Sequence, residues 1–318
     1  CCHNTDRDAE AEIVADYVNC GVDYVFGGGS KLFENRADGR DLFKELREKG
    51  YQTPRSWEEL AKIQKGKVFC VTDTVDTPLP AERGDLLARA SMKAIDLLGQ
   101  NPEGFFLMVE GGKIDWACHS NDAATTFHEV IDFDNAIKVA YEFYSQHPDE
   151  TLIVVTADHE TGGFVLGKGP YELNLQVLKN QKVSESGFTK VINQLRSKTN
   201  NQVSWEAVQQ ALKDNFGFWD KIQLNEKQEA RLKNVYEQTM KNQQVKMEKS
   251  EYAQDEPIAA EAKRIINEIA LTGWTSGGHS AGYVPVFAIG AGAEKFQNRI
   301  DNTEIPVKIA EAAGYSRK

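Results

Sequence analysis

The sequence predicts an α/β protein with a mostly parallel sheet and helices on both of its faces. Short apolar runs alternate with longer amphipathic stretches along the 318 residues, which is the pattern of strand–helix–strand units. Several of these runs are continuously apolar, as in strands that are buried on both sides. A polar stretch of helical period, residues 171–269, interrupts the alternation. We predict a single domain over residues 1–318 in which this stretch is a helical insertion.

Composition limits the class of partner. Hydrophobic residues make up 41% and charged residues 27% of the chain, as in an ordinary soluble globular protein. The formal net charge of −11 argues against nucleic acid as a partner, because phosphate backbones bind basic surfaces. A compact basic pocket for a small anion remains compatible with that charge. No apolar run approaches the about 18 residues of a membrane-spanning helix.

The five cysteines do not predict a disulfide framework. They stand at positions 1, 2, 20, 70 and 118. Their number is odd, and no two of them form a Cys-x-x-Cys pair. Cys118 lies beside a histidine and is a candidate metal ligand, but a buried, unreactive thiol is the preferred interpretation.

The first hundred residues alternate between helices and strands. Helices are predicted over residues 6–18, 41–49 and 83–98, and strands over residues 21–26 and 67–71. The first strand ends in Gly27-Gly28-Gly29, which lacks the Lys-Ser/Thr of a phosphate-binding P-loop, so a structural turn is favoured. The polar loop over residues 72–78 follows the second strand. It could hold a nucleophile beside a metal ligand, but a turn or substrate-side loop is preferred.

Residues 105–119 carry the strongest functional signal. Phe105 to Val109 predict a fully buried strand, after which come Glu110, a glycine pair, Asp115 and His119. Asp115 and His119 share one face if this turn becomes helical, because they are four residues apart. Carboxylate and imidazole donors on a tight turn are what a divalent metal needs.

Two later segments place metal-ligand residue types beside glycines. A long helix is predicted from after His119 to about His147, and a strand over residues 152–156 then ends in Asp158 and His159 before Gly162-Gly163. His279 follows Gly277-Gly278 and precedes a strand over residues 283–289, and a helix over residues 304–313 closes the chain. Ligands of parallel sheets bind outside the carboxyl ends of the strands. His279 therefore needs a loop that folds back over the same edge.

These donors predict a two-metal site. Asp115, His119 and His279 would leave one position open for water or substrate, which is the pattern of catalytic zinc. Asp158 and His159 diverge in an extended chain, but a turn at residues 161–163 could aim both at a second ion. A lone carboxylate such as Glu110 suits magnesium. Two metals about 4 Å apart can clamp the attacking and leaving oxygens of a phosphoryl displacement.

Four separated motifs resemble those of alkaline phosphatases in order and in spacing. They are Glu110-Gly-Gly-Lys-Ile-Asp115, then His119, then Thr156-Ala-Asp158-His159, and finally Gly-Gly-His279. The resemblance implies a first zinc on Asp115, His119 and His279, a second zinc on Asp158 and His159, and a magnesium on Glu110. It also implies that Arg7, in Asn4-Thr5-Asp6-Arg7-Asp8, binds phosphate through its planar fork.

The same resemblance implies two Zn²⁺ and one Mg²⁺ per active site and the hydrolysis of small phosphate monoesters through a phosphoserine intermediate, with inorganic phosphate released. A homodimer and a periplasmic or extracellular location are further implications. The sequence departs from the family pattern at one point, because it contains no Asp-Ser-Ala turn. In the family an earlier segment supplies this nucleophilic serine and an aspartate shared between the second zinc and magnesium.

We therefore expect the 318 residues to be a C-terminal portion of such a domain, incomplete at its N-terminus and inactive alone. Two alternatives stay open. The chain could be a catalytically inactive metal-binding fragment, or it could belong to a relative such as a phosphodiesterase or phosphomutase.

Overall fold

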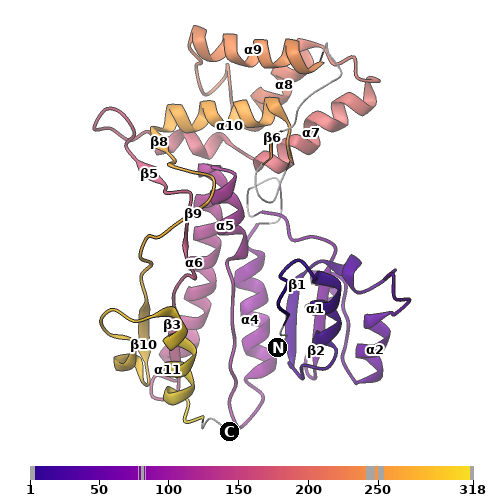
Figure 1. Cartoon of the computed structure of the whole chain (residues 1–318), viewed down its shortest axis with the longest axis vertical. Coiled ribbons are helices and arrows are strands. Elements are labelled where there is room, and N and C mark those ends of the chain that lie inside the picture. Colours follow the sequence, from indigo (N-terminus) through magenta and orange to yellow (C-terminus); the bar gives the residue numbers. More distant parts are fainter. Residues whose placement is uncertain are drawn as a thin grey trace. The chain divides into compact units, whose positions relative to one another are not determined.

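The computed structural model describes residues 4–77, 79, 82, 84–240, 248–249 and 254–315. The chain separates into two compact units, one formed by residues 1–76 and 86–109 and the other by residues 77–85 and 110–318. Figure 1 traces both units by colour along the sequence. Pro78 and Arg83, at the ends of the predicted polar loop and of the third predicted helix, lie outside the described residues. The single domain with an insertion stays a prediction.

The first unit is built on two parallel strands. β1 (Tyr24–Gly28) pairs with β2 (Val68–Thr72) in register from Tyr24 opposite Val68 to Gly28 opposite Thr72. The unit's helices are α1 (Glu10–Tyr17), η1 (Ser30–Leu32), α2 (Leu42–Glu48), α3 (Trp57–Leu60) and α4 (Leu86–Leu98). β1, β2, α1, α2 and α4 agree with the strands and helices predicted for the first hundred residues, whereas η1 and α3 were not predicted.

The core of the first unit explains why β2 is continuously apolar. Every residue from Val68 to Val71 is buried. Phe69 packs with Phe33 at a ring-centroid distance of 5.6 Å, and Phe33 stacks on Phe43 of α2 at 5.0 Å. The prediction of a buried strand here is confirmed.

The predicted strand over residues 105–109 is wrong. This segment lies within the described residues and forms no strand. Its side chains alternate between half-buried and exposed, with Phe106 63% and Met108 69% exposed. Alternation is the geometry of an extended chain with one covered face. The apolar run predicted burial on both faces, but burial depends on neighbouring elements that the run itself does not specify.

The second unit contains the remaining elements. Its helices are α5 (Gly112–His119), α6 (Ala123–Gln146), η2 (Leu175–Asn180), α7 (Glu185–Lys198), α8 (Trp205–Phe216), α9 (Glu226–Met240), α10 (Pro257–Ala270), η3 (Ala293–Phe296), η4 (Asn302–Glu304) and α11 (Ile305–Ala312). Its strand pairs are β3 (Leu152–Val155) with β10 (Phe287–Gly290), β4 (Glu160–Thr161) with β9 (His279–Ser280), β5 (Val165–Leu166) with β8 (Thr272–Gly273), and β6 (Glu248–Lys249) with β7 (Gln254–Asp255). All four of these pairs are antiparallel.

Helices dominate the described part of residues 171–269, where α7 to α10 pack around an aromatic core. Phe188, Phe216 and Phe218 have no exposed surface, and the Phe188 and Phe216 rings meet edge to face at 5.0 Å. α10 is the central helix of this segment. It begins at Pro257 and is capped by the Glu256 carboxylate, which accepts from the Ile258 and Ala259 N–H groups. Most of its residues are buried.

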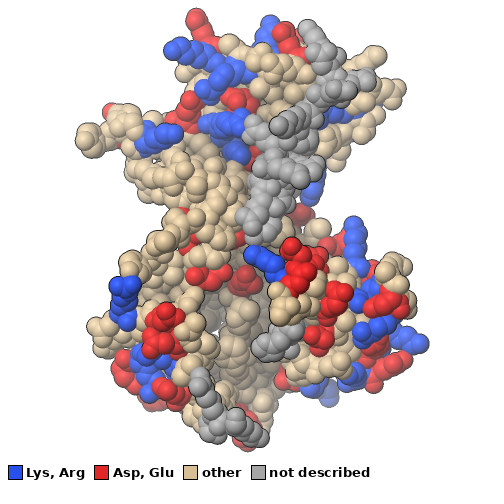
Figure 2. Space-filling model, in the orientation of Figure 1, with Lys and Arg blue, Asp and Glu red and all other residues tan. Residues whose placement is uncertain are grey.

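The surface of this helical segment is mixed in charge. Figure 2 shows acidic and basic side chains interspersed over it on the face in view, without a large basic patch. Within the described part of the chain, no helix has the combination of length and apolar character that crossing a membrane requires.

Candidate metal centre

α5 places two predicted ligands on one face. It spans Gly112–His119, so the four-residue spacing of Asp115 and His119 becomes a contact, with His119 Nε2 3.4 Å from Asp115 Oδ1. His119 is 3% exposed, whereas Asp115 is half-buried. The turn is helical, which is the condition under which Asp115 and His119 were expected to share one face.

The short β4–β9 pair brings two distant segments to this helix. Thr161 lies opposite His279, and Glu160 lies opposite Ser280. Gly162 and Gly163 follow with φ of +82° and +56°, a conformation that glycine adopts without strain. A Cβ on Gly163 would clash with the Thr275 side chain, so any other residue here would force that side chain to move. The β4–β9 pairing thus brings His279 beside the segment that carries His159.

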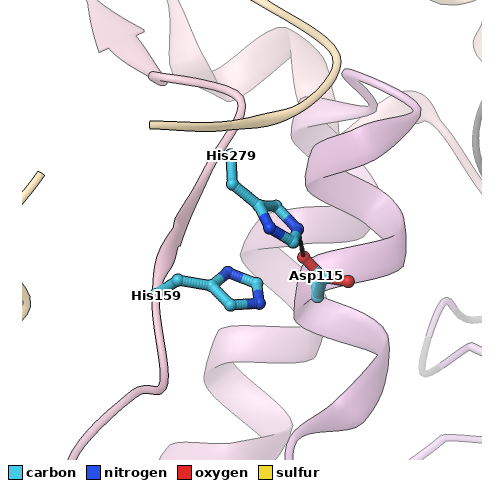
Figure 3. A group of neighbouring side chains, drawn as sticks. All are labelled: Asp115, His159 and His279. Atoms are coloured by element: carbon cyan, nitrogen blue, oxygen red, sulfur yellow. Dashed lines mark ion pairs between the residues drawn. The ribbon is translucent and has the colours of Figure 1, made fainter. Parts of the chain in front are cut away.

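Three side chains from these segments converge on one point. Asp115, His159 and His279 each offer a donor atom, and these atoms all lie within 4.8 Å of one another. Figure 3 shows the three side chains pointing toward each other, Asp115 from α5, His159 from the segment before β4 and His279 from β9. His279 Nε2 is 3.6 Å from Asp115 Oδ1, and the His159 and His279 rings stack at 3.6 Å between centroids. One carboxylate and two imidazoles at these distances from one another form a donor set that suits zinc.

His119 adds a second ring nitrogen, Nε2, to the side of the cluster formed by Asp115 and His279. Its Nδ1 lies 2.6 Å from the Gly277 carbonyl oxygen, which can only accept, so Nδ1 carries the proton and donates. In the neutral ring the lone pair is then on Nε2, which lies 3.0 Å from His279 Nε2. A backbone carbonyl that fixes the tautomer and leaves the other nitrogen unprotonated is the usual arrangement of a metal-ligating histidine. The residues present therefore fit a divalent cation.

The other predicted site residues are less closely gathered. The Asp158 carboxylate is exposed and lies 3.2 Å from His159 Nε2. Glu110 is exposed and precedes α5, and it is not among the three converging donors. Arg7 is exposed in the first unit, two residues before the Ala9 cap of α1. The structure groups His159 with Asp115 and His279, so the division of ligands between two ions stays a prediction.

The sequence reasoning missed Thr161 as a site residue. Its Oγ1 donates to Asp115 Oδ1 at 2.5 Å and lies 3.2 Å from His159 Nδ1. A hydroxyl in this position holds the carboxylate toward the two histidines. Its place just before the glycine pair, in a segment already singled out, was the available signal.

Cys118 is not part of the donor cluster. Its thiol is buried within α5, with Sγ 3.9 Å from Thr126 Oγ1. Burial raises the pKa of this thiol to about 11. The interpretation of Cys118 as a buried, unreactive thiol agrees with this environment.

Comparison with known proteins gives a consistent result. The alkaline phosphatase family profile matches residues 1–315. Alkaline phosphatase 4 of Bacillus subtilis strain 168 is 31% identical over 95% of this chain. The chain spans 61% of the length of that relative.

Solved structures agree with the sequence relatives. The cold-active alkaline phosphatase of a psychrophilic Shewanella species is 30% identical, with a TM-score of 0.80 over 98% of this chain and 70% of the Shewanella chain. A variant of the alkaline phosphatase of the Antarctic bacterium TAB5, solved with Mg bound, is 25% identical. Its TM-score is 0.63 over 99% of this chain and 67% of the TAB5 chain. These likenesses confirm the α/β fold class.

Proposed function

The chain belongs to the alkaline phosphatase family, and on this basis we propose that it forms the metal-binding part of a phosphomonoester hydrolase. The observation that carries the proposal is the convergence of Asp115, His159 and His279, with His119 beside them. A cluster of carboxylate and imidazole donors such as this is the kind of site that metal-assisted phosphoryl transfer uses.

The proposed ligand sets follow the family motifs. Asp115, His119 and His279 would hold one zinc, Asp158 and His159 a second zinc, and Glu110 a magnesium. The magnesium is supported by the Mg bound in the TAB5 variant. When bound, these ions would supply positive charge that stabilises the developing charge on phosphoryl oxygens.

The chain's own side chains then have defined tasks. The Gly277 carbonyl keeps the proton on His119 Nδ1, so Nε2 stays available as a ligand. Thr161 holds the Asp115 carboxylate by its hydrogen bond. Arg7 would hold two phosphoryl oxygens through its planar guanidinium. A phosphoserine intermediate is proposed from the family, although no Asp-Ser-Ala turn occurs in these 318 residues.

The substrate class and the setting are part of the same proposal. Small phosphate monoesters would be the substrates and inorganic phosphate the released product. We further infer a homodimer in the periplasm or outside the cell. The acidic net charge of −11 supports small esters over nucleic acid.

A second candidate is a chain that binds metal without turnover. The observation in its favour is the missing Asp-Ser-Ala turn, because the donor cluster alone supplies no nucleophile. Metal content separates the two candidates. Two zincs and one magnesium per chain favour a complete metal site, and one tightly held ion favours the second candidate.

The test of the proposed function is hydrolysis of p-nitrophenyl phosphate with Zn²⁺ and Mg²⁺ supplied. The complete gene product should turn over, and Asp115→Ala in it should not. The 318 residues alone should show little or no turnover. An Asp115→Ala protein with undiminished activity would contradict the metal assignment, and rapid turnover by the 318 residues would contradict the need for a further serine segment.

A further inference from the structure

The C-terminal end of α5 is held by side chains of α10, from the helical segment of residues 171–269. Lys263 Nζ donates to the Ser120 carbonyl oxygen at 2.5 Å, and Asn267 Nδ2 donates to the Asn121 carbonyl oxygen at 2.7 Å. Both residues, Lys263 and Asn267, are buried, each 7% exposed. The last carbonyls of a helix have no partner within the helix, so donors from outside fix where that end lies. His119 is the residue just before Ser120.

Asn121 extends this connection to the loop that carries His279. Its backbone has φ of +53°, and its Nδ2 donates to the carbonyl oxygens of Cys118 and Ser276, each at 2.9 Å. The residue after Ser276 is Gly277, whose carbonyl accepts from His119 Nδ1. One asparagine therefore joins the His119 end of α5 to the loop that orients the His119 ring.

The surroundings of Lys263 are charged and buried. Its ammonium group also pairs with the Glu185 carboxylate at the start of α7, and Glu185 is 1% exposed. The Glu185 N–H donates to Asp122 Oδ2 at 3.0 Å, while Asp122 Oδ1 caps α6 by accepting from the Thr125 N–H at 3.1 Å. Buried charges are tolerated only with partners in good geometry, so this network favours one arrangement of α5, α6, α7 and α10.

We propose that α10 positions the metal ligands, with Lys263, Asn267 and Asn121 as positioning residues that touch neither metal nor substrate. Lys263 and Asn267 fix the end of α5, and Asn121 fixes the distance between that end and the His279 loop. The helical segment thereby contributes to metal affinity and not only to packing. This inference rests on the proposed metal site.

Two variants remove the connection with little change in shape. Asn267→Leu replaces the amide with an apolar side chain of similar size. Asn121→Gly keeps the left-handed backbone conformation and removes both side-chain hydrogen bonds. Outer-shell partners of metal ligands typically contribute about 10–100-fold to affinity, so we expect Zn²⁺ to bind each variant about tenfold more weakly.

A matched control weakens the contact between α9 and α10 without changing the contacts of α10 to α5. Arg231 on α9 pairs with Glu261 at 2.7 Å and with Glu268 at 2.6 Å, both on α10. Arg231→Met removes these ion pairs and leaves every contact to α5 in place. We expect the Zn²⁺ affinity of this control to equal that of the unmodified chain, even where its thermal unfolding temperature falls.

The measurement is Zn²⁺ competition against a fluorescent chelator, with thermal unfolding in EDTA followed by circular dichroism as the stability readout. Weaker Zn²⁺ binding by Asn121→Gly or Asn267→Leu, with Arg231→Met unchanged, supports the proposal. Unchanged affinity in both α5-contact variants, or an equal loss in Arg231→Met, overturns it. An unmodified chain that binds no Zn²⁺ overturns the metal site itself, which is a different result from a variant effect.

Discussion

His119 and His279 face each other with their Nε2 atoms 3.0 Å apart, although their ring planes are inclined by 48°. His119 donates from Nδ1 to the Gly277 carbonyl, so in the neutral ring the lone pair is on Nε2, the atom that faces His279 and Asp115. Two imidazoles and a carboxylate facing one point would repel one another's lone pairs without a proton or a cation between them. The tautomer of His119 therefore bears on the metal proposal, because a cation between these groups would relieve the repulsion.

Thr161→Val tests how far the hydroxyl beside this cluster contributes. The substitution keeps the side-chain volume and removes the donor to Asp115 Oδ1. We expect Zn²⁺ to bind about tenfold more weakly, because a carboxylate ligand that loses its hydrogen bond is less well oriented. Isothermal titration of the chain with Zn²⁺ measures the change.

The control for this substitution is Thr199→Val at the end of α7. The Thr199 hydroxyl donates to the Leu195 carbonyl at 2.8 Å, outside the donor cluster. Its replacement should leave Zn²⁺ binding as it was. Equal losses at positions 161 and 199 would show that the hydroxyl of Thr161 has no specific role.

The contact between Asp115 and His119 was predictable because it is local. Both residues belong to one helical turn, and the four-residue spacing alone places them together once α5 forms. The turn at Gly162-Gly163 was predictable for a similar reason, since a glycine pair permits positive φ.

No local sequence pattern predicts that His279 lies beside Asp115 and His119. It depends on the pairing of Thr161 with His279, two residues in segments far apart in the sequence. The closeness of His159 to Asp115 and His279 could not be predicted for a related reason. Asp158 and His159 are adjacent, and only the orientation of the folded turn decides which of the two side chains points inward. Residues 105–109 show the same limit, because their burial depends on what packs against them.

Alkylation of the Cys70 and Cys118 thiols tests whether each of them is buried in the native chain. Burial raises the pKa of Cys70 to about 12 and that of Cys118 to about 11, and both are largely inaccessible. Since the thiolate is the reactive form, neither should be alkylated by iodoacetamide at pH 8 in the native chain. Peptide mass spectrometry measures the extent at each position. The more accessible Cys20 should be labelled under the same conditions, and all three should react in urea.

Native labelling of Cys118 at the rate of Cys20 would contradict the burial of α5 against its neighbours. The same comparison without and with Zn²⁺ is informative, because Cys118 immediately precedes a proposed ligand. We expect Cys118 to be protected in both states, since its burial does not depend on the ion.

The Arg196–Glu256 pair at the start of α10 gives a prediction for stability and its pH dependence. Glu256 has no exposed surface, and its carboxylate accepts from Arg196 Nη2 at 2.6 Å. Burial raises the pKa of Glu256, while Arg196 opposes this increase. Arg196→Met leaves the carboxylate buried without its counter-ion, which typically costs about 3–5 kcal/mol of unfolding free energy.

The pH dependence of this loss has a definite sign. In the variant the folded-state pKa of Glu256 rises further above its unfolded value, so the folded state holds a proton that the unfolded state releases. Stability is then retained below the ordinary glutamate pKa and falls as pH rises toward the folded-state pKa. Urea unfolding in EDTA at a series of pH values from acid to neutral measures this trend relative to the unmodified chain.

The matched control is the double variant Arg196→Met with Glu256→Gln. Glutamine keeps a cap acceptor for the Ile258 and Ala259 N–H groups and carries no charge. It should recover much of the lost unfolding free energy and remove the additional pH dependence. The prediction is that the Glu256 carboxylate needs Arg196 as its counter-ion. It would be contradicted if Arg196→Met alone were as stable as the double variant, or if Arg196→Met gained stability as pH rises.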